Sequence, residues 1–303
     1  MTMERNGHKW EFREGFLIGG CLLAAGLALQ YILGPVDWRW LAAPVNKIVL
    51  ALLTGLIAVI FLLRKKVQAF EWMMHSYAAV SSLACALALT LVMGLTTQKP
   101  SGGLEWLSQM IRFWPFVLVW TWVLIVDGLA ALNHFLRLRA SEIPFILNHL
   151  GVFVAIVAAT LGSADMQQLQ MQVHYGKPEN RALSEYGEVV DPGLAIELHE
   201  FTAEYYPDNT PKLFASEITI HTRDDSHLRG TVLVNKPMKV DGWKIYQAGY
   251  DQAKGSKSPY SIFLLVKDPW LPAVYAGIYM MIAGALCLML FMAPKPIRKE
   301  DEQ

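Results

Sequence analysis

The sequence predicts a polytopic α-helical membrane protein with about six transmembrane helices and an inserted extracytoplasmic domain of antiparallel β-structure. The 303-residue chain is 54% hydrophobic and only 17% charged, whereas a soluble chain carries about 25% charged residues. Its apolar residues are gathered into long runs. One polar segment near the C-terminal end shows the period-two alternation of strands instead.

Six apolar runs are long enough to cross a bilayer, because a hydrocarbon core of ~30 Å needs about 20 helical residues. They occupy residues 16–33, 45–63, 77–96, 114–135, 144–162 and 270–292. Each run therefore predicts one transmembrane helix.

Lysine and arginine are concentrated in every second loop, which predicts the orientation of the helices because basic residues favour the cytoplasmic side. The basic residues that carry this prediction are Arg5, Lys9, Arg13, Arg64, Lys65, Lys66, Arg137, Arg139, Lys295, Arg298 and Lys299. Both termini are therefore expected in the cytoplasm, and residues 163–269 on the opposite side. The polar residues before the first run have no signal-peptide cleavage site, so we expect a retained cytoplasmic tail.

Residues 163–269 predict a small antiparallel β-domain. Alternating stretches bounded by turn residues lie at 194–205, 214–222, 228–235, 243–250 and 259–267. The side chains expected to face its core are Ile218, Ile220, Val232, Val234 and Ile245. Residues 235–238 are expected to form a turn outside the strands, because Pro237 has no N–H to donate to a ladder.

These patterns divide the chain into four parts. Residues 1–69 form a cytoplasmic tail and an additional transmembrane hairpin, and residues 70–162 form three core transmembrane helices. Residues 163–269 form the extracytoplasmic β-rich domain, and residues 270–303 form the last transmembrane helix with a cytoplasmic tail.

Composition and motifs exclude several classes of function. The net charge is zero and no basic stripe is present, which argues against nucleic acid as a partner. Cys21, Cys85 and Cys287 lie singly in apolar runs, so there is no CxxC redox motif and no CxxCH haem-attachment motif. No hydrolase, metalloprotease or phosphate-loop motif occurs, and no catalytic residue is predicted. The β-domain is expected to bind no metal.

Three membrane histidines are the candidate cofactor-binding residues. His149 lies about one turn inside the fifth apolar run, where an ionisable side chain is costly and usually has a partner in the bundle. It is either a packing or interfacial histidine or an axial ligand of a haem iron. His75 and His134, at the cytoplasmic ends of the third and fourth runs, are either interfacial residues or further haem contacts.

Asp127 is the other unusual membrane residue, a carboxylate in the middle of the fourth run. It precedes His134 by seven residues, which places the two on nearly one helix face. It is either a buried acid paired across helices or a support for a ligand or polar cavity. In both cases Asp127 and His134 are expected to face neighbouring protein and not lipid.

Two stretches, IELHEFTAEYYPDNTPKLFASEITI and GTVLVNKPMKVDGWKIYQAGYD, closely resemble the extracytoplasmic domain of the ResB (CcsB) family of cytochrome c biogenesis proteins. The resemblance continues through about residues 70–300, and the H-L-G histidine of the family is matched by His149. Departures are small: Gln247-Ala248-Gly249 stands where the family commonly has Gln-Ser-Ser, and Asn209 replaces a turn glycine.

The resemblance implies a subunit of the System II cytochrome c synthetase of the bacterial inner membrane. Such a complex moves haem b outward and presents it to CxxCH apocytochromes for covalent attachment. His149 matches the family's iron-binding position. The implied partners are haem, membrane lipid, apocytochrome c and a separate CcsA-type chain, because no W-G-x-x-W-x-W-D motif occurs here. The chain alone is then an incomplete holocytochrome c synthetase.

Two other functions are weighed against this interpretation. A haem b subunit of a quinol-linked redox complex needs histidine pairs at two depths, whereas the histidines here cluster toward one side. A small-solute transporter commonly shows internal repeats and broken helices, and neither is evident in the sequence. Both alternatives are disfavoured.

Overall fold

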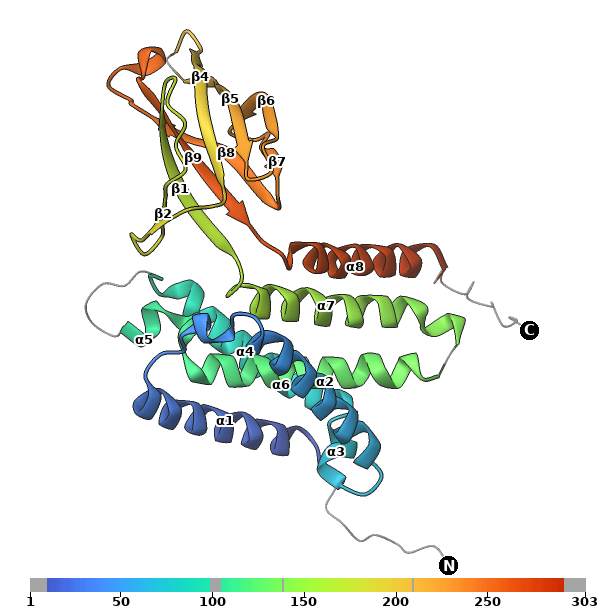
Figure 1. Ribbon diagram of the computed structural model, residues 1–303. Helices are drawn as coiled ribbons and strands as arrows, with labels where there is room; N and C mark the ends of the chain where they lie inside the picture. The colour runs from blue at the N-terminus through green and yellow to red at the C-terminus, as the bar shows by residue number, and fades with distance from the viewer. Residues whose placement is uncertain (1–9, 99–104, 138, 209, 292–303) are drawn as a thin grey trace, which may run out of the picture. The chain divides into compact units, whose positions relative to one another are not determined.

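The computed structural model describes residues 10–98, 105–137, 139–208 and 210–291 (Figure 1). The chain forms two compact units. The β-unit consists of residues 165–269, and the helical unit consists of the residues before and after them. Several basic residues used to predict the orientation, among them Arg5, Lys9 and Lys295, lie outside the described residues.

The helical unit contains the six predicted spans. They are α1 (Phe12–Leu33), α2 (Val45–Leu63), α4 (Ser76–Leu95), α6 (Trp114–Phe135), α7 (Ile143–Gly162) and α8 (Leu271–Phe291). Shorter helical segments include α3 (Gln68–Trp72), α5 (Glu105–Ser108), η1 (Trp38–Leu41), η2 (Met110–Arg112) and η3 (Ala140–Glu142). All six spans are long and apolar enough to cross a membrane. The protein is therefore a multi-pass membrane protein, and the predicted fold class is confirmed.

Local sequence explains where several of these helices begin and end. Pro115 and Pro144 lie in the first turns of α6 and α7, where a missing N–H leaves no hydrogen bond unmade. Gly34 ends α1 with a φ of 73°, and its N–H donates to the carbonyl of Gln30. Glycine adopts this left-handed conformation without steric cost, so α1 stops there.

The helices pack closely where glycines face a neighbouring backbone. A Cβ atom on Gly26 of α1 would lie 2.5 Å from the backbone nitrogen of Pro115 in α6. One on Gly151 of α7 would lie 2.7 Å from the carbonyl oxygen of Gly277 in α8. Small residues allow such close contact between membrane helices, whose association depends on van der Waals packing. Asn46, fully buried in α2, donates to the carbonyl of Leu161 in α7 at 3.1 Å.

The β-unit consists of two antiparallel sheets. The larger sheet has the order β3-β2-β1-β9-β8-β7, and the smaller has the order β4-β5-β6. The strands are β1 (Gln167–His174), β2 (Ala182–Ser184), β3 (Val189–Val190), β4 (Leu194–Tyr205), β5 (Pro211–Thr222), β6 (His227–Leu233), β7 (Met238–Val240), β8 (Trp243–Tyr250) and β9 (Tyr260–Lys267). Their inward side chains form one core shared by the two sheets. This core includes the fully buried Ile196, Ile218, Ile245 and Phe263. This is the arrangement of a β-sandwich.

The predicted inward residues Ile218, Ile220, Val232 and Ile245 are buried. The prediction for Val234 is wrong: its side chain is 46% exposed, because β6 ends at Leu233 and the alternation ends with it. Pro237 lies outside the strands as predicted, although the turn is shifted by one residue, to 234–237, because β6 ends at Leu233 and β7 begins at Met238.

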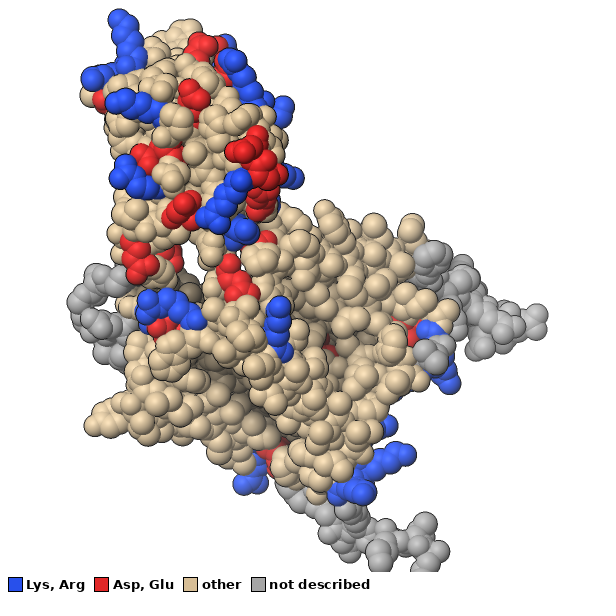
Figure 2. All heavy atoms as spheres, in the orientation of Figure 1, with Lys and Arg blue, Asp and Glu red and all other residues tan. Residues whose placement is uncertain are grey.

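Charge is distributed very differently over the two units. On the face shown in Figure 2, charged side chains are spread over the β-unit, whereas on the helical unit they are sparser and separated by broad uncharged surface. Charged side chains are expensive in hydrocarbon. The contrast therefore agrees with a helical unit surrounded by lipid.

Candidate functional site

Two of the three candidate histidines lie together where α6 packs against α7. His134 belongs to the last turn of α6 and His149 to α7, and each has a carboxylate partner. The phenyl ring of Phe145 lies between the two imidazoles. We refer to Asp127, His134, Glu142, Phe145 and His149 as the histidine cluster.

The pair formed by His149 and Asp127 joins two helices inside the apolar spans. Nδ1 of His149 lies 2.6 Å from Oδ1 of Asp127. Because an ionised carboxylate can only accept, the imidazole N–H belongs on Nδ1, and the lone pair of Nε2 is left for a ligand. The Asp127 side chain is 13% exposed and that of His149 is 38% exposed. The carboxylate is thus enclosed while the imidazole can be reached.

The second oxygen of Asp127 distinguishes this carboxylate from others in the helical unit. Oδ2 is buried and has no hydrogen-bond partner among the described residues. An unsatisfied buried oxygen costs about 1–3 kcal/mol. The bond to His149 is therefore the interaction that compensates for placing Asp127 in an apolar helix.

The pair formed by His134 and Glu142 lies at the ends of helices. Nδ1 of His134 is 2.5 Å from Oε2 of Glu142, and Nη1 of Arg137 is 3.7 Å from the other carboxylate oxygen. Glu142 thus has a cationic neighbour in Arg137, whereas no ion pair of Asp127 with Lys or Arg occurs among the described residues. The pair closes the short connection between α6 and α7, because its partners are only eight residues apart.

Phe145 keeps the two imidazoles apart. Its ring centroid is 3.8 Å from that of His134 and 4.0 Å from that of His149, with interplanar angles of 28° and 30°. Two rings stacked this closely on one phenyl group must occupy its opposite faces. His134 and His149 therefore cannot be the two axial ligands of one iron in this arrangement.

Sequence reasoning located Asp127, His134 and His149 but did not identify which residues they contact. Asp127 and His134 face neighbouring protein, as predicted. They do not act together, however, because Asp127 contacts His149 and His134 contacts Glu142. The sequence analysis missed Glu142 and Phe145. Glu142 and Phe145 precede His149 by seven and four residues, a spacing that places all three on one helix face. This spacing is the feature of the sequence from which Glu142 and Phe145 could have been predicted.

His75 lies apart from the histidine cluster. It precedes α4 and lines a separate cavity of about 560 Å³ with Trp10, Glu71 and Trp72. Its described contacts include neither of the other membrane histidines. Among the residues that the structure describes, no group of three or more His, Cys, Asp or Glu side chains is placed to hold a metal ion. Each histidine of the cluster bonds its carboxylate through Nδ1, which leaves Nε2 for a ligand, and His149 is the more exposed of the two.

Comparison with known proteins matches residues 137–264 to the ResB-like family. The matched segment includes His149 but begins after Asp127 and His134, and it is shorter than the span of about 70–300 expected from the sequence. A cytochrome c biogenesis protein CcsB of Prochlorococcus marinus (strain NATL1A) is 27% identical over 108 residues, which are 36% of this chain and 24% of that protein.

Among solved structures, a cytochrome c heme lyase CcmF is similar with a TM-score of 0.39 and 15% identity. The similarity covers 93% of this chain and 46% of that one. Likeness at this level has no bearing on function. This chain thus spans less than half of the length of each of these two proteins.

Proposed function

Since the chain is a ResB-like protein, we propose that it is a subunit of a System II cytochrome c biogenesis complex in the bacterial inner membrane. In this proposal it helps carry haem b across the membrane and presents it for covalent attachment to the CxxCH motifs of apocytochromes c. Haem is a transiently bound substrate. The thioether chemistry requires a separate CcsA-type chain.

The observation that carries the proposal is the hydrogen bond between His149 and Asp127. A carboxylate on Nδ1 fixes the tautomer and the ring orientation, and it makes Nε2 a better donor to a metal. Nε2 belongs to a side chain that is 38% exposed, so a haem iron can reach it from outside the α6–α7 pair. The residues present therefore fit one axial haem ligand at His149.

The remaining residues of the cluster are assigned supporting roles. Phe145 limits the movement of the His149 ring by stacking on it. His134, held by Glu142 on the other face of Phe145, is proposed to contact the porphyrin edge and not the iron. His75 is proposed as a separate haem contact, in its cavity near the start of α4. The second axial ligand would come from the partner chain.

Visible spectroscopy of the purified protein, with and without a co-expressed CcsA-type partner, tests this assignment. Wild-type protein should co-purify with haem b, and His149→Ala should lose the haem absorption and cytochrome c maturation. Added imidazole should restore part of both by occupying the vacant iron site. His174→Ala, at an exposed position of β1, is the matched control and should keep its haem. Unchanged haem and maturation in His149→Ala would refute the ligand role.

The proposed orientation has its own test. A reporter fused after Lys257, which lies in the β-unit, should give an extracytoplasmic signal, because the β-unit must meet apocytochromes outside the cytoplasm. The other predicted fusion site, Lys99, lies outside the described residues. A cytoplasmic signal after Lys257 would contradict the proposed topology.

The alternative of a quinol-linked haem b subunit gains no support from the geometry. The two histidines of the cluster are paired with carboxylates and separated by Phe145, so they do not form the bis-histidine site that such a subunit needs. We therefore do not propose it.

A further inference from the structure

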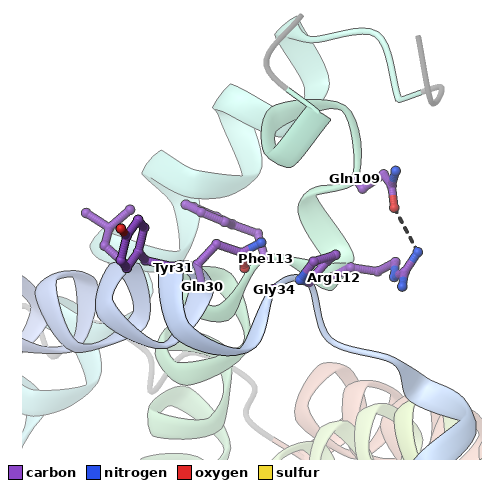
Figure 3. Close-up of a pocket in the computed structure, with 8 residues that line it drawn as sticks. Gln30, Tyr31, Gly34, Gln109, Arg112 and Phe113 are labelled. Atoms are coloured by element: carbon purple, nitrogen blue, oxygen red, sulfur yellow. Dashed lines mark hydrogen bonds between the residues drawn. The ribbon is translucent and has the colours of Figure 1, made fainter. Parts of the chain in front are cut away.

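A second cavity, of about 370 Å³, lies at the opposite end of α6 from His134 and is shown in Figure 3. It is formed where α1 ends and α6 begins. Gln30 and Tyr31 come from the last turns of α1, and Gln109, Arg112 and Phe113 come from the segment that leads into α6. The cavity therefore joins the additional N-terminal hairpin to a core helix, at the level where membrane-spanning helices stop.

The two amide side chains have their acceptor oxygens already occupied. The backbone N–H of Trp114 donates to Oε1 of Gln30 at 3.2 Å, and Nη1 of Arg112 donates to Oε1 of Gln109 at 2.9 Å. The NH₂ groups of both glutamines donate no hydrogen bond among the described residues. Each amide thus contributes two free donors, while its oxygen already accepts one hydrogen bond.

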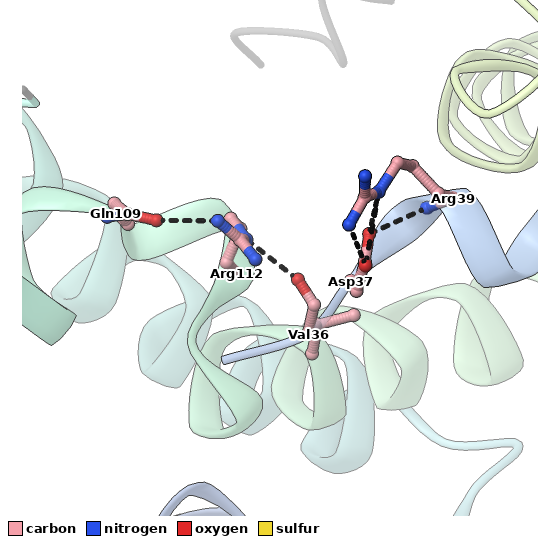
Figure 4. A network of polar contacts seen from close by, with 5 residues as sticks. All are labelled: Val36, Asp37, Arg39, Gln109 and Arg112. Atoms are coloured by element: carbon pink, nitrogen blue, oxygen red, sulfur yellow. Dashed lines mark hydrogen bonds and ion pairs between the residues drawn. The ribbon is translucent and has the colours of Figure 1, made fainter. Parts of the chain in front are cut away.

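Arg112 adds a positive charge that forms no ion pair among the described residues, and Asp37 compensates it only from a distance. Its Nε donates to the carbonyl of Val36 at 2.8 Å, while the N–H of Val36 donates to the carbonyl of Arg112 (Figure 4). The neighbouring Asp37 is bound by Arg39 at 2.7 Å, and this hydrogen-bonded arginine, more than Arg112, holds the pKa of Asp37 below its usual value.

The other walls of the cavity are largely apolar or already bonded. Leu27, Phe113 and the ring of Tyr31 supply apolar surface. The carbonyl of Gly34 accepts from Nε1 of Trp114 at 3.0 Å, so this acceptor is also occupied. The cavity therefore combines free hydrogen-bond donors and a guanidinium without a direct ion pair with an apolar wall.

We propose that this cavity binds the oxyanion of an amphiphile, a phosphate or a carboxylate, with the apolar part of the ligand against Leu27, Tyr31 and Phe113. Charged oxyanions accept strong hydrogen bonds from arginine and amide donors. The same chemistry is offered by an anionic phospholipid headgroup and by the propionates of haem. The proposal does not depend on His149 or on the proposed function.

Glutamine-to-glutamate changes test the site with little disturbance of the fold. Gln30→Glu and Gln109→Glu keep the oxygen that Trp114 or Arg112 needs, but they replace the free donors with a negative charge. Full-length protein in detergent is titrated by native mass spectrometry with phosphatidylglycerol and with the diacylglycerol of the same chains. A second pair of titrations uses haem and haem dimethyl ester. Gln168→Glu, an exposed change on β1, is the control with matched charge.

Each glutamate variant should bind its oxyanion about tenfold more weakly, the loss expected for one charge-assisted hydrogen bond. Preferential loss of phosphatidylglycerol would assign the site to a lipid headgroup, and preferential loss of haem over its ester would assign it to propionates. Equal binding by wild type, Gln30→Glu and Gln109→Glu in both titrations would overturn the proposal. Thermal unfolding of each variant verifies that the protein is folded.

Discussion

The two imidazole–carboxylate pairs of the helical unit have the same chemistry and different surroundings. His134 and Glu142 are eight residues apart, at the connection of two helices, and Arg137 approaches the same carboxylate. His149 and Asp127 are 22 residues apart, and the second oxygen of Asp127 is buried without a partner. The first pair is part of a locally satisfied loop, whereas the second connects two apolar spans and depends on a single bond.

This difference shows which pair is able to support a ligand. A carboxylate with several neighbours tolerates the loss of one of them, but a buried carboxylate with a single partner does not. The more exposed imidazole, that of His149, belongs to the more deeply enclosed carboxylate. Haem binding should therefore respond to changes at Asp127 far more than to changes at Glu142.

The largest expected effect is on haem affinity. Asp127→Ala removes the acceptor that orients His149, and loss of such a supporting residue typically weakens metal binding by about 10–100-fold. Glu142→Ala should weaken haem binding by less than about threefold, since it acts on the other histidine. Haem titration followed by absorbance measures both. Equal losses in the two variants would show that the pairs do not differ in function.

A double-mutant cycle measures the interaction energy within each pair directly. Single and double alanine variants of His149 and Asp127 should give an interaction energy of about 1–3 kcal/mol, because the Asp127 carboxylate is enclosed and its described hydrogen bond is to His149. The same cycle for His134 and Glu142 should give a smaller interaction energy, because Arg137 also approaches Glu142 and remains when His134 is removed. Unfolding in mixed micelles supplies the free energies. A larger coupling for His134 and Glu142 would reverse the comparison.

Phe145→Leu tests whether the ring between the pairs contributes packing or ligation. Leucine fills much of the same volume but removes both stacking contacts, each worth about 0.5–1.5 kcal/mol. We expect a lower free energy of unfolding and haem affinity within about threefold of wild type. Complete loss of haem would instead make Phe145 part of the binding site.

Asp127→Asn should have a smaller effect than Asp127→Ala. The amide oxygen can still accept from Nδ1 of His149, so the orientation of the ring is kept while the charge is lost. Because a charge-assisted hydrogen bond is about twice as strong as a neutral one, haem affinity should fall by about two- to fivefold. A loss as large as that of Asp127→Ala would show that charge, and not orientation, is what His149 requires.

The sequence predicted the helices closely because hydropathy depends on local composition alone. The limits of α2 and α6, for example, agree with the predicted 45–63 and 114–135. It missed β1, whose inward Leu169, Met171 and Val173 alternate with glutamines that make the segment look polar. It also missed the short strands β2, β3 and β7, which contain too few residues to show a period.

The candidate site was only partly predictable for a different physical reason. The cost of an ionisable group in hydrocarbon identified Asp127 and His149 individually. Which residue each one contacts depends on the rotation of α6 against α7, and a single sequence does not contain that rotation. Of the interpretations of Asp127, pairing across helices agrees with the structure, because Asp127 contacts His149 on the neighbouring helix.

The first and last strands of the β-unit lie side by side, so the two ends of this unit are adjacent. β1 and β9 pair along their whole length, from Gln167 opposite Lys267 to His174 opposite Tyr260. In the helical unit, Gly162 at the end of α7 packs against Trp270 at the start of α8. The chain thus leaves and re-enters the helical unit at neighbouring points. The β-unit is a cassette with adjacent ends, and a short linker in its place should still allow α7 and α8 to form a hairpin.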